Sequence, residues 1–211
     1  MARKPYHLKN APKENVYTEL LKQGVMQGII PARTAEARRW YRDAARGVNS
    51  VNETELMRSE PSRFRQSVVP GRMYMFYYDP KLKDSLPYYD QFPLIFPLEV
   101  YGDRFLGLNL HYLPYGYRAK LMDALYALSN NTRYDATTKI QLSYKILKAA
   151  SATKYYKPCV KMYLKKHVRS RFVSVGADEW DIAIFLPTER FEKAEKTKVW
   201  SDSTNKIRYG K

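Results

Sequence analysis

Apolar positions near the N-terminus recur at the spacing of an α-helix. Residues 1–15 are basic and rich in proline, which predicts an extended arm. Asn15 is a favourable N-cap residue, and the apolar positions after it predict a short helix that ends at Gln23 or Gln27. We expect the arm and this helix to form one unit.

A second helix is predicted between Thr34 and Gly47. Thr34 is a suitable N-cap, and Gly47 stands where a helix commonly ends. The following segment, residues 49–69, is polar and contains Pro61. This pattern predicts a linker with at most a weak helix.

The hydrophobic period changes after Gly71. Residues 72–78 are a run of aromatic residues and methionines that predicts a β-strand. Residues 92–100 predict a second strand, and their two prolines favour an edge or interrupted strand over a central one. Residues 105–112 alternate as a third strand, in which Gly107 indicates a bulge or bend. Short, strongly bent strands of this kind predict a small barrel of the SH3-like type.

Beyond Pro114 the apolar positions return to helical spacing. Residues 117–128 predict one helix. The pattern of residues 138–149 fits either a helix or a strand, and the length of the segment favours the helix. Residues 157–168 predict the clearest helix of the chain, because Pro158 suits the first turn and basic residues four apart share one face.

The remaining segments complete an α+β protein. Residues 172–175 predict a strand, residues 177–185 a short helix or strand, and residues 192–211 a charged tail anchored by Trp200. We expect a small SH3-like antiparallel β-barrel flanked by N-terminal helices and a basic C-terminal helical segment. The expected units are 1–33 (arm and short helix), 34–69 (helix and linker), 70–114 (barrel core), 115–190 (basic helical segment packed on the barrel) and 191–211 (charged tail).

Charge is strongly segregated along the 211 residues. The net charge of +16 divides into +6 for residues 1–70, −1 for residues 71–114, +11 for residues 115–172 and 0 for residues 173–211. In residues 115–172, 13 basic residues face only 2 acidic ones. This segregation favours a polyanionic partner, either nucleic acid or an acidic protein surface.

The sequence lacks the patterns of several enzyme classes. It has no phosphate-binding glycine loop, and one cysteine with three histidines offers little material for a disulfide, a metal site or a metal cofactor. Cys159 is expected to be a partly buried structural residue. No stretch is apolar enough for a membrane span, and we expect neither export by a signal peptide nor a small-molecule substrate. A magnesium nuclease remains an alternative, with Asp79, Asp178, Glu179 and Asp181 as candidate ligands.

The basic segment supplies the candidate DNA contacts. Lysine and arginine side chains bind phosphates in a largely sequence-independent manner. The candidates are Arg118, Lys120, Lys145, Lys148, Lys154, Lys157, Lys161, Lys165, Arg169 and Arg171.

The aromatic residues of the predicted barrel have two interpretations. They could stack on bases, or they could form the core and rim of the barrel, and the net negative charge of the segment favours the second. Exposed members of this set would contact other proteins. The candidate protein-interface residues are Trp40, Tyr77, Tyr78, Tyr88 and Tyr89.

Several blocks of the chain resemble a virion protein family of T-even-type myoviruses and their cyanophage relatives. The blocks include PGRMYMFYYDPK at 70–81, LPYYDQFPL at 86–94, FLGLNLHYLP at 105–114, PCVKMYL at 158–164 and FLPTERF at 185–191, and the resemblance is most specific in the tyrosine-rich block. The resemblance covers roughly residues 34–203. Members of the family are described as DNA end protectors or structural proteins, which implies a virion protein that holds or shields the end of the packaged genome.

Residues and resemblance together lead to one main hypothesis and two alternatives. The main hypothesis is a non-enzymatic virion protein at the head or neck, assembled in the host cytoplasm, that binds the backbone of double-stranded DNA through its basic helical surface. Its protein partners would be portal or neck subunits. The first alternative is a tail or baseplate component that docks on acidic neighbours, and the second is the magnesium nuclease.

Overall fold

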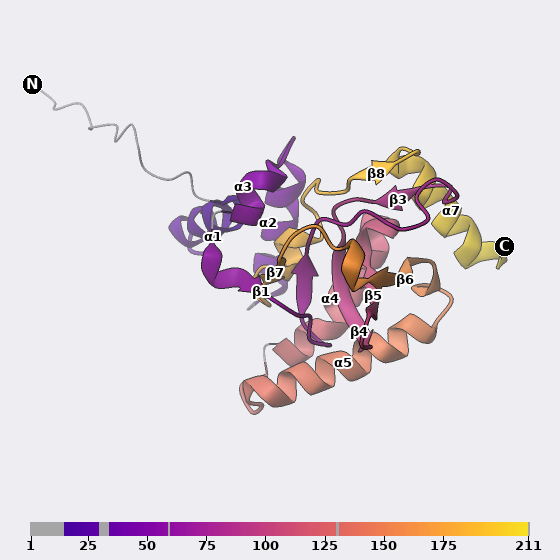
Figure 1. The fold of residues 1–211 in the computed structure, drawn as a ribbon. Helices are drawn as coiled ribbons and strands as arrows, with labels where there is room; N and C mark the ends of the chain where they lie inside the picture. The colour runs from indigo at the N-terminus through magenta and orange to yellow at the C-terminus, as the bar shows by residue number, and fades with distance from the viewer. Residues whose placement is uncertain (1–14, 30–33, 59, 130, 211) are drawn as a thin grey trace, which may run out of the picture.

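The computed structural model describes residues 15–29, 34–58, 60–129 and 131–210. The predicted arm, apart from Asn15, lies outside these residues. In the described part, helices surround a curved antiparallel sheet, with the N-terminal helices at one side and the C-terminal helix at the other (Figure 1). Every helix in this part is too short or too polar to cross a membrane.

The two N-terminal helices begin at the predicted caps. Helix α1, Val16–Met26, starts where the Asn15 side chain accepts hydrogen bonds from two backbone N–H groups. Helix α2, Ala35–Arg46, starts at Thr34, whose hydroxyl accepts from the N–H of Ala37 at 3.0 Å. The predicted linker is more ordered than expected, since it contains helix α3, Glu53–Arg58, and the 3₁₀ turn η1, Pro61–Arg63.

Six antiparallel strands form the main sheet, and two short strands form a second one. The order in the main sheet is β1 (Phe64–Arg65), β7 (Phe172–Val175), β2 (Met73–Met75), β4 (Leu94–Val100), β5 (Arg104–Asn109) and β6 (Val160–Leu164). The second sheet pairs β3 (Tyr89–Asp90) with β8 (Phe191–Glu192). The main sheet therefore draws its strands from both halves of the chain.

Both faces of the main sheet are buried. On β2, Met73 and Met75 face the larger apolar cluster beneath the helices, whereas Tyr74 faces a second cluster on the opposite side. That second cluster is mostly aromatic and contains Phe76, Phe105, Tyr163 and Phe172. Burial on both faces explains why residues 72–78 form an almost continuous apolar run.

The predicted SH3-like barrel is not confirmed. The sheet curves around the aromatic cluster, but β1 and β6 remain its two edges and do not pair with each other. A stacked contact between Phe105 and Tyr163, with ring centroids 5.3 Å apart, fills the concave side instead. Side-chain packing rather than closure of the ladder completes this core.

The position of β4 corrects the prediction of an edge strand. β4 lies between β2 and β5 in the interior of the sheet. The predicted interruption is present, because the register with β5 shifts between Pro97 and Glu99. A proline is tolerated inside a sheet at such an irregularity, since no ladder hydrogen bond is required of it there.

Gly107 lies opposite this irregularity, and two side chains approach it closely. It pairs with Pro97, and a Cβ atom at this position would lie 3.1 Å from Ile95 Cδ1 and 3.3 Å from Tyr163 Cε2. The irregularity belongs to the partner strand, and the glycine leaves room for the two side chains. The predicted strand 105–112 itself ends at Asn109, after which Leu110–Tyr112 form the 3₁₀ turn η2.

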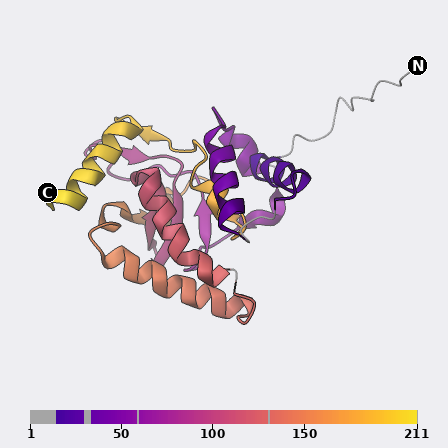
Figure 2. The same ribbon diagram turned by 180° about the vertical axis from the view of Figure 1, so that it is seen from behind.

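Two long helices cover one face of the sheet, as predicted. Helix α4, Tyr115–Ser129, and helix α5, Ala136–Ala152, pack against each other, and Figure 2 shows α4 in front of the strands and α5 below it. The choice of a helix over a strand for residues 138–149 is thus confirmed. The segment 177–185 contains the short helix α6, Trp180–Ala183.

The predicted helix at residues 157–168 is wrong. These residues form the 3₁₀ turn η3 (Lys157–Cys159), strand β6 and the 3₁₀ turn η4 (Lys165–His167). β5 needs a partner on its free edge, and β6 supplies it in a five-residue ladder that buries Tyr163 against the aromatic cluster. Pairing with β5 and burial of Tyr163 outweigh the local helical pattern of these residues.

The predicted charged tail is mostly a helix. Helix α7, Lys196–Tyr209, buries Val199, Ser203 and Ile207 and ends at Gly210, whose positive φ of 70° favours glycine. The indole Nε1 of Trp200 donates to the carbonyl of His111 at 2.8 Å, which confirms the predicted anchoring role of this residue.

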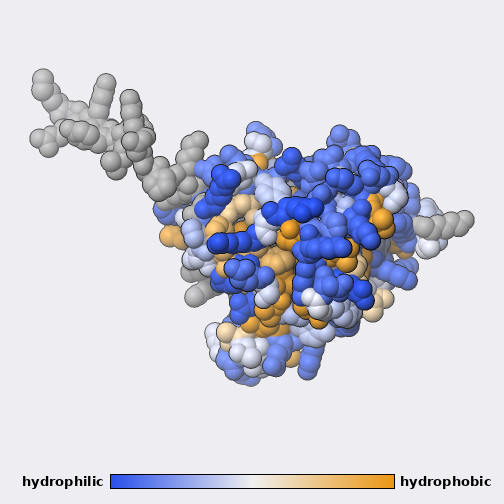
Figure 3. Space-filling view, viewed as in Figure 1, coloured by the Kyte–Doolittle hydropathy of each residue, from blue (hydrophilic) through white to orange (hydrophobic). Residues whose placement is uncertain are grey.

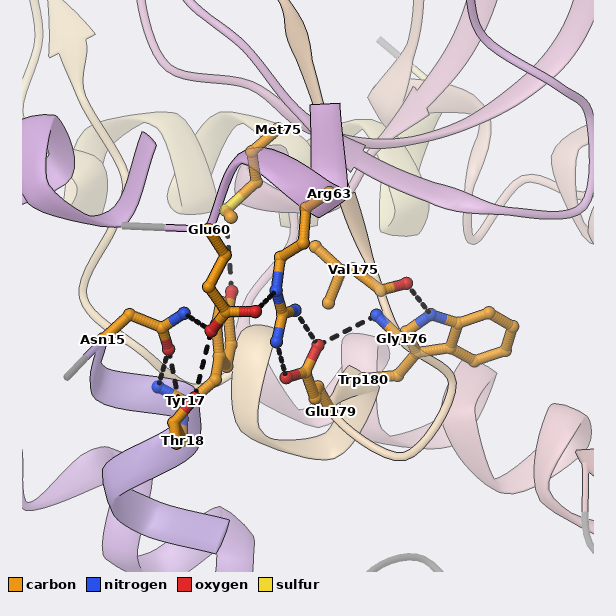
Figure 4. Close-up of polar contacts among 10 residues, drawn as sticks. All are labelled: Asn15, Tyr17, Thr18, Glu60, Arg63, Met75, Val175, Gly176, Glu179 and Trp180. Atoms are coloured by element: carbon orange, nitrogen blue, oxygen red, sulfur yellow. Dashed lines mark hydrogen bonds and ion pairs between the residues drawn. The ribbon is translucent and has the colours of Figure 1, made fainter. Parts of the chain in front are cut away.

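An ion-pair network joins the N-terminal helices to the rest of the protein (Figure 4). Arg63 lies at its centre, paired with Glu60 on one side and with the buried Glu179 on the other, where Nη2 donates to Oε1 at 2.7 Å. Glu60 also accepts hydrogen bonds from the side chains of Asn15 and Thr18. The cap of α1 is therefore connected through Arg63 to the turn before α6.

Arg63→Met is expected to lower the free energy of unfolding by about 3–5 kcal/mol, because it leaves the Glu179 carboxylate buried without a cation. Urea denaturation of the purified protein measures the change. The matched control is Arg65→Met, since Arg65 is exposed and donates only to backbone carbonyls. Equal stability of the two variants would contradict a structural role for the network.

Candidate nucleic-acid interface

The basic residues of segment 115–172 do not share one helical face. Lys161 lies on β6, Lys165 begins η4, and Arg169 lies in extended chain whose N–H donates to the carbonyl of Tyr77 at 2.8 Å. Side chains on a strand alternate between its two faces, so the arc expected on a helix does not form. The structure distributes the ten predicted DNA contacts over several parts of the surface and the interior.

Arg118 is fully buried and cannot contact DNA from this position. Its guanidinium donates to the carbonyls of Leu113, His111 and Ile184 at 2.7–3.2 Å. Nη2 also lies 2.7 Å from Oε1 of Glu189, at an angle outside hydrogen-bonding geometry, so this contact is an ion pair. Arg118 holds the chain after η2 against the end of α6.

Four further predicted contacts interact with groups of the protein itself at its surface. Lys148 pairs with Glu99, Arg169 pairs with Asp79 at 3.3 Å, Lys165 Nζ donates to the carbonyls of Tyr101 and Gly102, and Arg171 lies 5.5 Å from the ring of Phe64. All four side chains are exposed, so phosphate binding would compete with these contacts.

The remaining exposed lysines gather near the end of α5. Lys120, Lys154 and Lys157 are exposed, and among the described residues none has a carboxylate within ion-pair distance; we call these three the α5-end lysines. The rings of Tyr117 and Tyr155 stack between them at 6.4 Å. Lys120 and Lys154 each lie within 6 Å of one of these rings. Lys145 is exposed on α5 itself.

The predicted protein-interface aromatics occupy two places. Trp40 and Tyr77 are half-buried against the larger core, where they contact Tyr41 and Phe92 at 4.9 Å. Tyr78, Tyr88 and Tyr89 line a cleft instead. Figure 3 shows the face in the view of Figure 1, where hydrophilic residues surround a central area of apolar ones.

That cleft is a cavity of about 300 Å³ between the segment before β3, strand β6 and helix α7. We call it the tyrosine–lysine cleft. Its walls are aromatic apart from two lysines, one aspartate and a few aliphatic residues. The lining residues are Tyr78, Pro80, Leu86, Pro87, Tyr88, Tyr89, Asp90, Tyr112, Lys161, Met162, Tyr163 and Lys206.

Lys161 is the most unusual group of the cleft. Its Nζ lies 4.0 Å from the centroid of the Tyr112 ring. Burial, together with the nearby cation of Lys206, lowers the pKa of Lys161 to about 8. Among the described residues neither lysine has a carboxylate within ion-pair distance. Two uncompensated cations next to each other favour the binding of an anion.

Lys206 is the residue of the cleft that sequence reasoning missed. The pattern of residues 192–211 predicts a charged tail, whereas α7 packs against η3 and brings Lys206 to Lys161. The signal available was weak: Val199, Ser203 and Ile207 recur at helical spacing, but one of the three is polar. Tyr112 was also missed as a cleft residue, because the sequence pattern places it at the end of a strand.

A buried polar network lies behind the cleft. Asp90 Oδ2 accepts hydrogen bonds from His111 Nδ1 at 2.8 Å and from Asn109 Nδ2 at 2.9 Å. His111 Nε2 lies 3.1 Å from the hydroxyl of Thr188. The order Asp90, His111, Thr188 resembles a catalytic triad, but the Thr188 side chain is buried and does not line the tyrosine–lysine cleft. The arrangement is suited to holding β3 and β5 together.

Three of the four carboxylates considered for a nuclease are paired with basic side chains, whereas Asp178 is exposed and forms no ion pair among the described residues. Asp79 contacts Lys83 and Arg169, Glu179 contacts Arg63, and Asp181 contacts Arg38 and Arg42. Within the described ranges, no three acidic, histidine or cysteine side chains converge on a point that could hold a metal ion. Cys159 is completely buried rather than partly buried as predicted, and burial raises the pKa of its thiol, which disfavours the nucleophilic thiolate.

Comparison with protein families shows to which family the chain belongs. A family model described as Phage T4 terminal DNA protecting protein matches residues 15–206. The chain belongs to this family. Comparisons with curated proteins and with solved structures found no match. The matched range includes both the α5-end lysines and every residue that lines the tyrosine–lysine cleft of this family member.

Lys161→Met is expected to stabilise the protein at pH 7 by about 2 kcal/mol, because it removes a partly desolvated cation. In the unfolded chain the lysine pKa returns to 10.5, so between pH 8 and 10.5 the unfolded state binds more protons and wild-type stability rises with pH. The advantage of the variant is therefore complete below pH 8 and disappears near pH 10.5. Denaturant unfolding at both ends of this range measures it.

Lys157→Met is the control for this experiment, since Lys157 is exposed. Its stability relative to the wild type should not depend on pH over the same range. A Lys161→Met variant that is less stable than the wild type at pH 7 would show that the cation of Lys161 is not destabilised by its surroundings.

Proposed function

We propose that the protein binds the end of phage DNA and shields it from exonucleases, as a non-catalytic virion component at the head or neck. The observation that carries this proposal is the family match across residues 15–206. Protection without catalysis requires only that the protein occupy the terminus more tightly than an attacking enzyme does.

Basic side chains that have no carboxylate partner within the described ranges supply the affinity. The α5-end lysines are exposed. Strand β6, which carries Lys161, and helix α7, which carries Lys206, lie on the same side of the molecule as the C-terminal end of α5 (Figure 1). Each phosphate that such a lysine neutralises releases counterions from DNA, so the affinity is largely independent of sequence. This surface replaces the single basic helix that the sequence predicts.

The absence of a catalytic role is part of the proposal. Three of the four candidate nuclease carboxylates, Asp79, Glu179 and Asp181, are neutralised by lysine and arginine partners, and Asp181 and Glu179 are buried. A magnesium nuclease would need at least two carboxylates free to bind the ion. These ion pairs support stability of the fold rather than hydrolysis.

The double variant Lys154→Glu/Lys157→Glu is expected to weaken binding to linear duplex DNA and to reduce the slope of log affinity against log salt by about 0.9 for each phosphate that the variant no longer neutralises. Fluorescence anisotropy over a salt series measures both quantities. The matched control is Arg39→Glu/Arg58→Glu, which makes the same change of net charge at exposed positions in the N-terminal helices. Identical affinities and slopes for the two double variants would contradict the assigned surface.

Protection is tested by adding a processive exonuclease to end-labelled linear DNA in the presence of the protein. The proposal requires slower loss of the label, with no shortening of DNA by the protein alone when magnesium or manganese is added. Localisation by antibody labelling of intact particles separates the head or neck from the tail or baseplate. A tail position would favour the alternative in which the basic surface docks on acidic subunits.

A further inference from the structure

The tyrosine–lysine cleft has a chemistry that general phosphate binding does not require. Phosphate contacts along a duplex need exposed cations only, whereas this cleft combines two cations with aromatic walls. We propose that the cleft binds the terminal nucleotide of the DNA, with its unpaired base against the tyrosines and its phosphate on Lys161 and Lys206. This inference rests on the proposed end-protecting function.

The aromatic walls offer a stacking surface. Tyr88 is fixed between the rings of Tyr112 and Phe191, at 6.1 and 6.5 Å, and is half-buried. Tyr89 is also half-buried and lines the cleft, and no ring contact occupies its face among the described residues. Aromatic side chains in single-strand-binding proteins stack on bases without regard to sequence, because every base has a π-face. Such tolerance suits a protein that must bind whatever base ends the genome.

The polar groups of the cleft are suited to a phosphate. Lys161 and Lys206 come from different elements, β6 and α7, and repel each other, so an anion between them removes an unfavourable interaction. Asp90 also lines the cleft, but its carboxylate is buried and already accepts hydrogen bonds from Phe92 N, His111 and Asn109. Its charge is therefore largely satisfied by groups of the protein itself.

The size of the cleft decides what can enter. A volume of about 300 Å³ lies at the lower end of the range of ligand pockets, which suits one nucleoside rather than a base pair that enters with both of its sugars. A terminal base must therefore leave its partner strand before it binds. Unpairing a base costs free energy that a single-stranded extension does not require. The cleft consequently favours an unpaired or frayed end over a closed blunt end. Covalently closed circular DNA has no terminal nucleotide, so it offers the cleft no ligand.

The experiment compares three DNA molecules of the same sequence: a linear duplex with a one-nucleotide single-stranded extension, the same duplex with blunt G·C ends, and a covalently closed circle. We expect the wild-type protein to bind the extended duplex about tenfold more tightly than the blunt duplex. Tyr89→Ala should abolish this preference while leaving the affinity for the circle unchanged. Lys206→Gln should also abolish the preference, and it should weaken binding to all three DNA molecules because Lys206 belongs to the basic surface as well. Both positions are at least partly exposed, and thermal unfolding verifies that the variants fold.

The matched control is Arg208→Gln, which removes one exposed charge from the same turn of α7 outside the cleft and should retain the preference. Equal binding of extended and blunt duplexes by a wild-type protein that still protects linear DNA would overturn the cleft assignment alone. Failure to bind or protect any linear DNA would overturn the proposed function itself. Binding of a free deoxynucleoside monophosphate as tightly as the extended duplex would overturn the assignment to a DNA end and reassign the cleft to free nucleotides.

Discussion

Burial of both faces of one curved sheet is the constraint on which the rest of the structure depends. One face packs against α2, α4, α5 and α6 through the larger apolar cluster, and the other encloses a mostly aromatic cluster. Neither face can be completed by strands that are adjacent in sequence. The chain must return from the C-terminal half to place β6 beside β5 and β7 beside β2. The two ends of the sheet thus depend on contacts that are distant in sequence.

The same constraint decides which charges are available to a partner. Arg118 and Arg63 hold segments together by pairing with Glu189 and Glu179, and Arg38 with Arg42 binds Asp181. Buried carboxylates of this kind require a cation, because an unpaired charge in the interior is costly. Part of the large positive charge is consequently structural. What remains at the surface is smaller than the residue count indicates, and it includes the α5-end lysines and Lys206.

The tyrosine–lysine cleft follows from the meeting of three segments. The tyrosine-rich stretch before β3, the edge strand β6 and the helix α7 enclose a cavity that none of them forms alone. Its two lysines lie 45 positions apart in the chain, on β6 and α7, and neither has a carboxylate partner in the described part of the protein. An end-binding protein gains specificity from such a site, since exposed lysines distinguish neither an end from internal DNA nor a base from a phosphate.

Local interactions determined what the sequence alone could establish. Asn15 and Thr34 cap helices through their own side chains, and the helical period of residues 117–128 and 138–149 does not depend on a distant partner. The segregated charge and the family resemblance are likewise properties of the linear chain. Only the tertiary structure decided that residues 160–164 form a strand, that α7 carries Lys206 into a cleft, and that Arg118 is buried. Strand pairing, ion pairing and enclosure of a cavity each require a neighbour that is remote in sequence, and a periodic pattern holds no information about that neighbour.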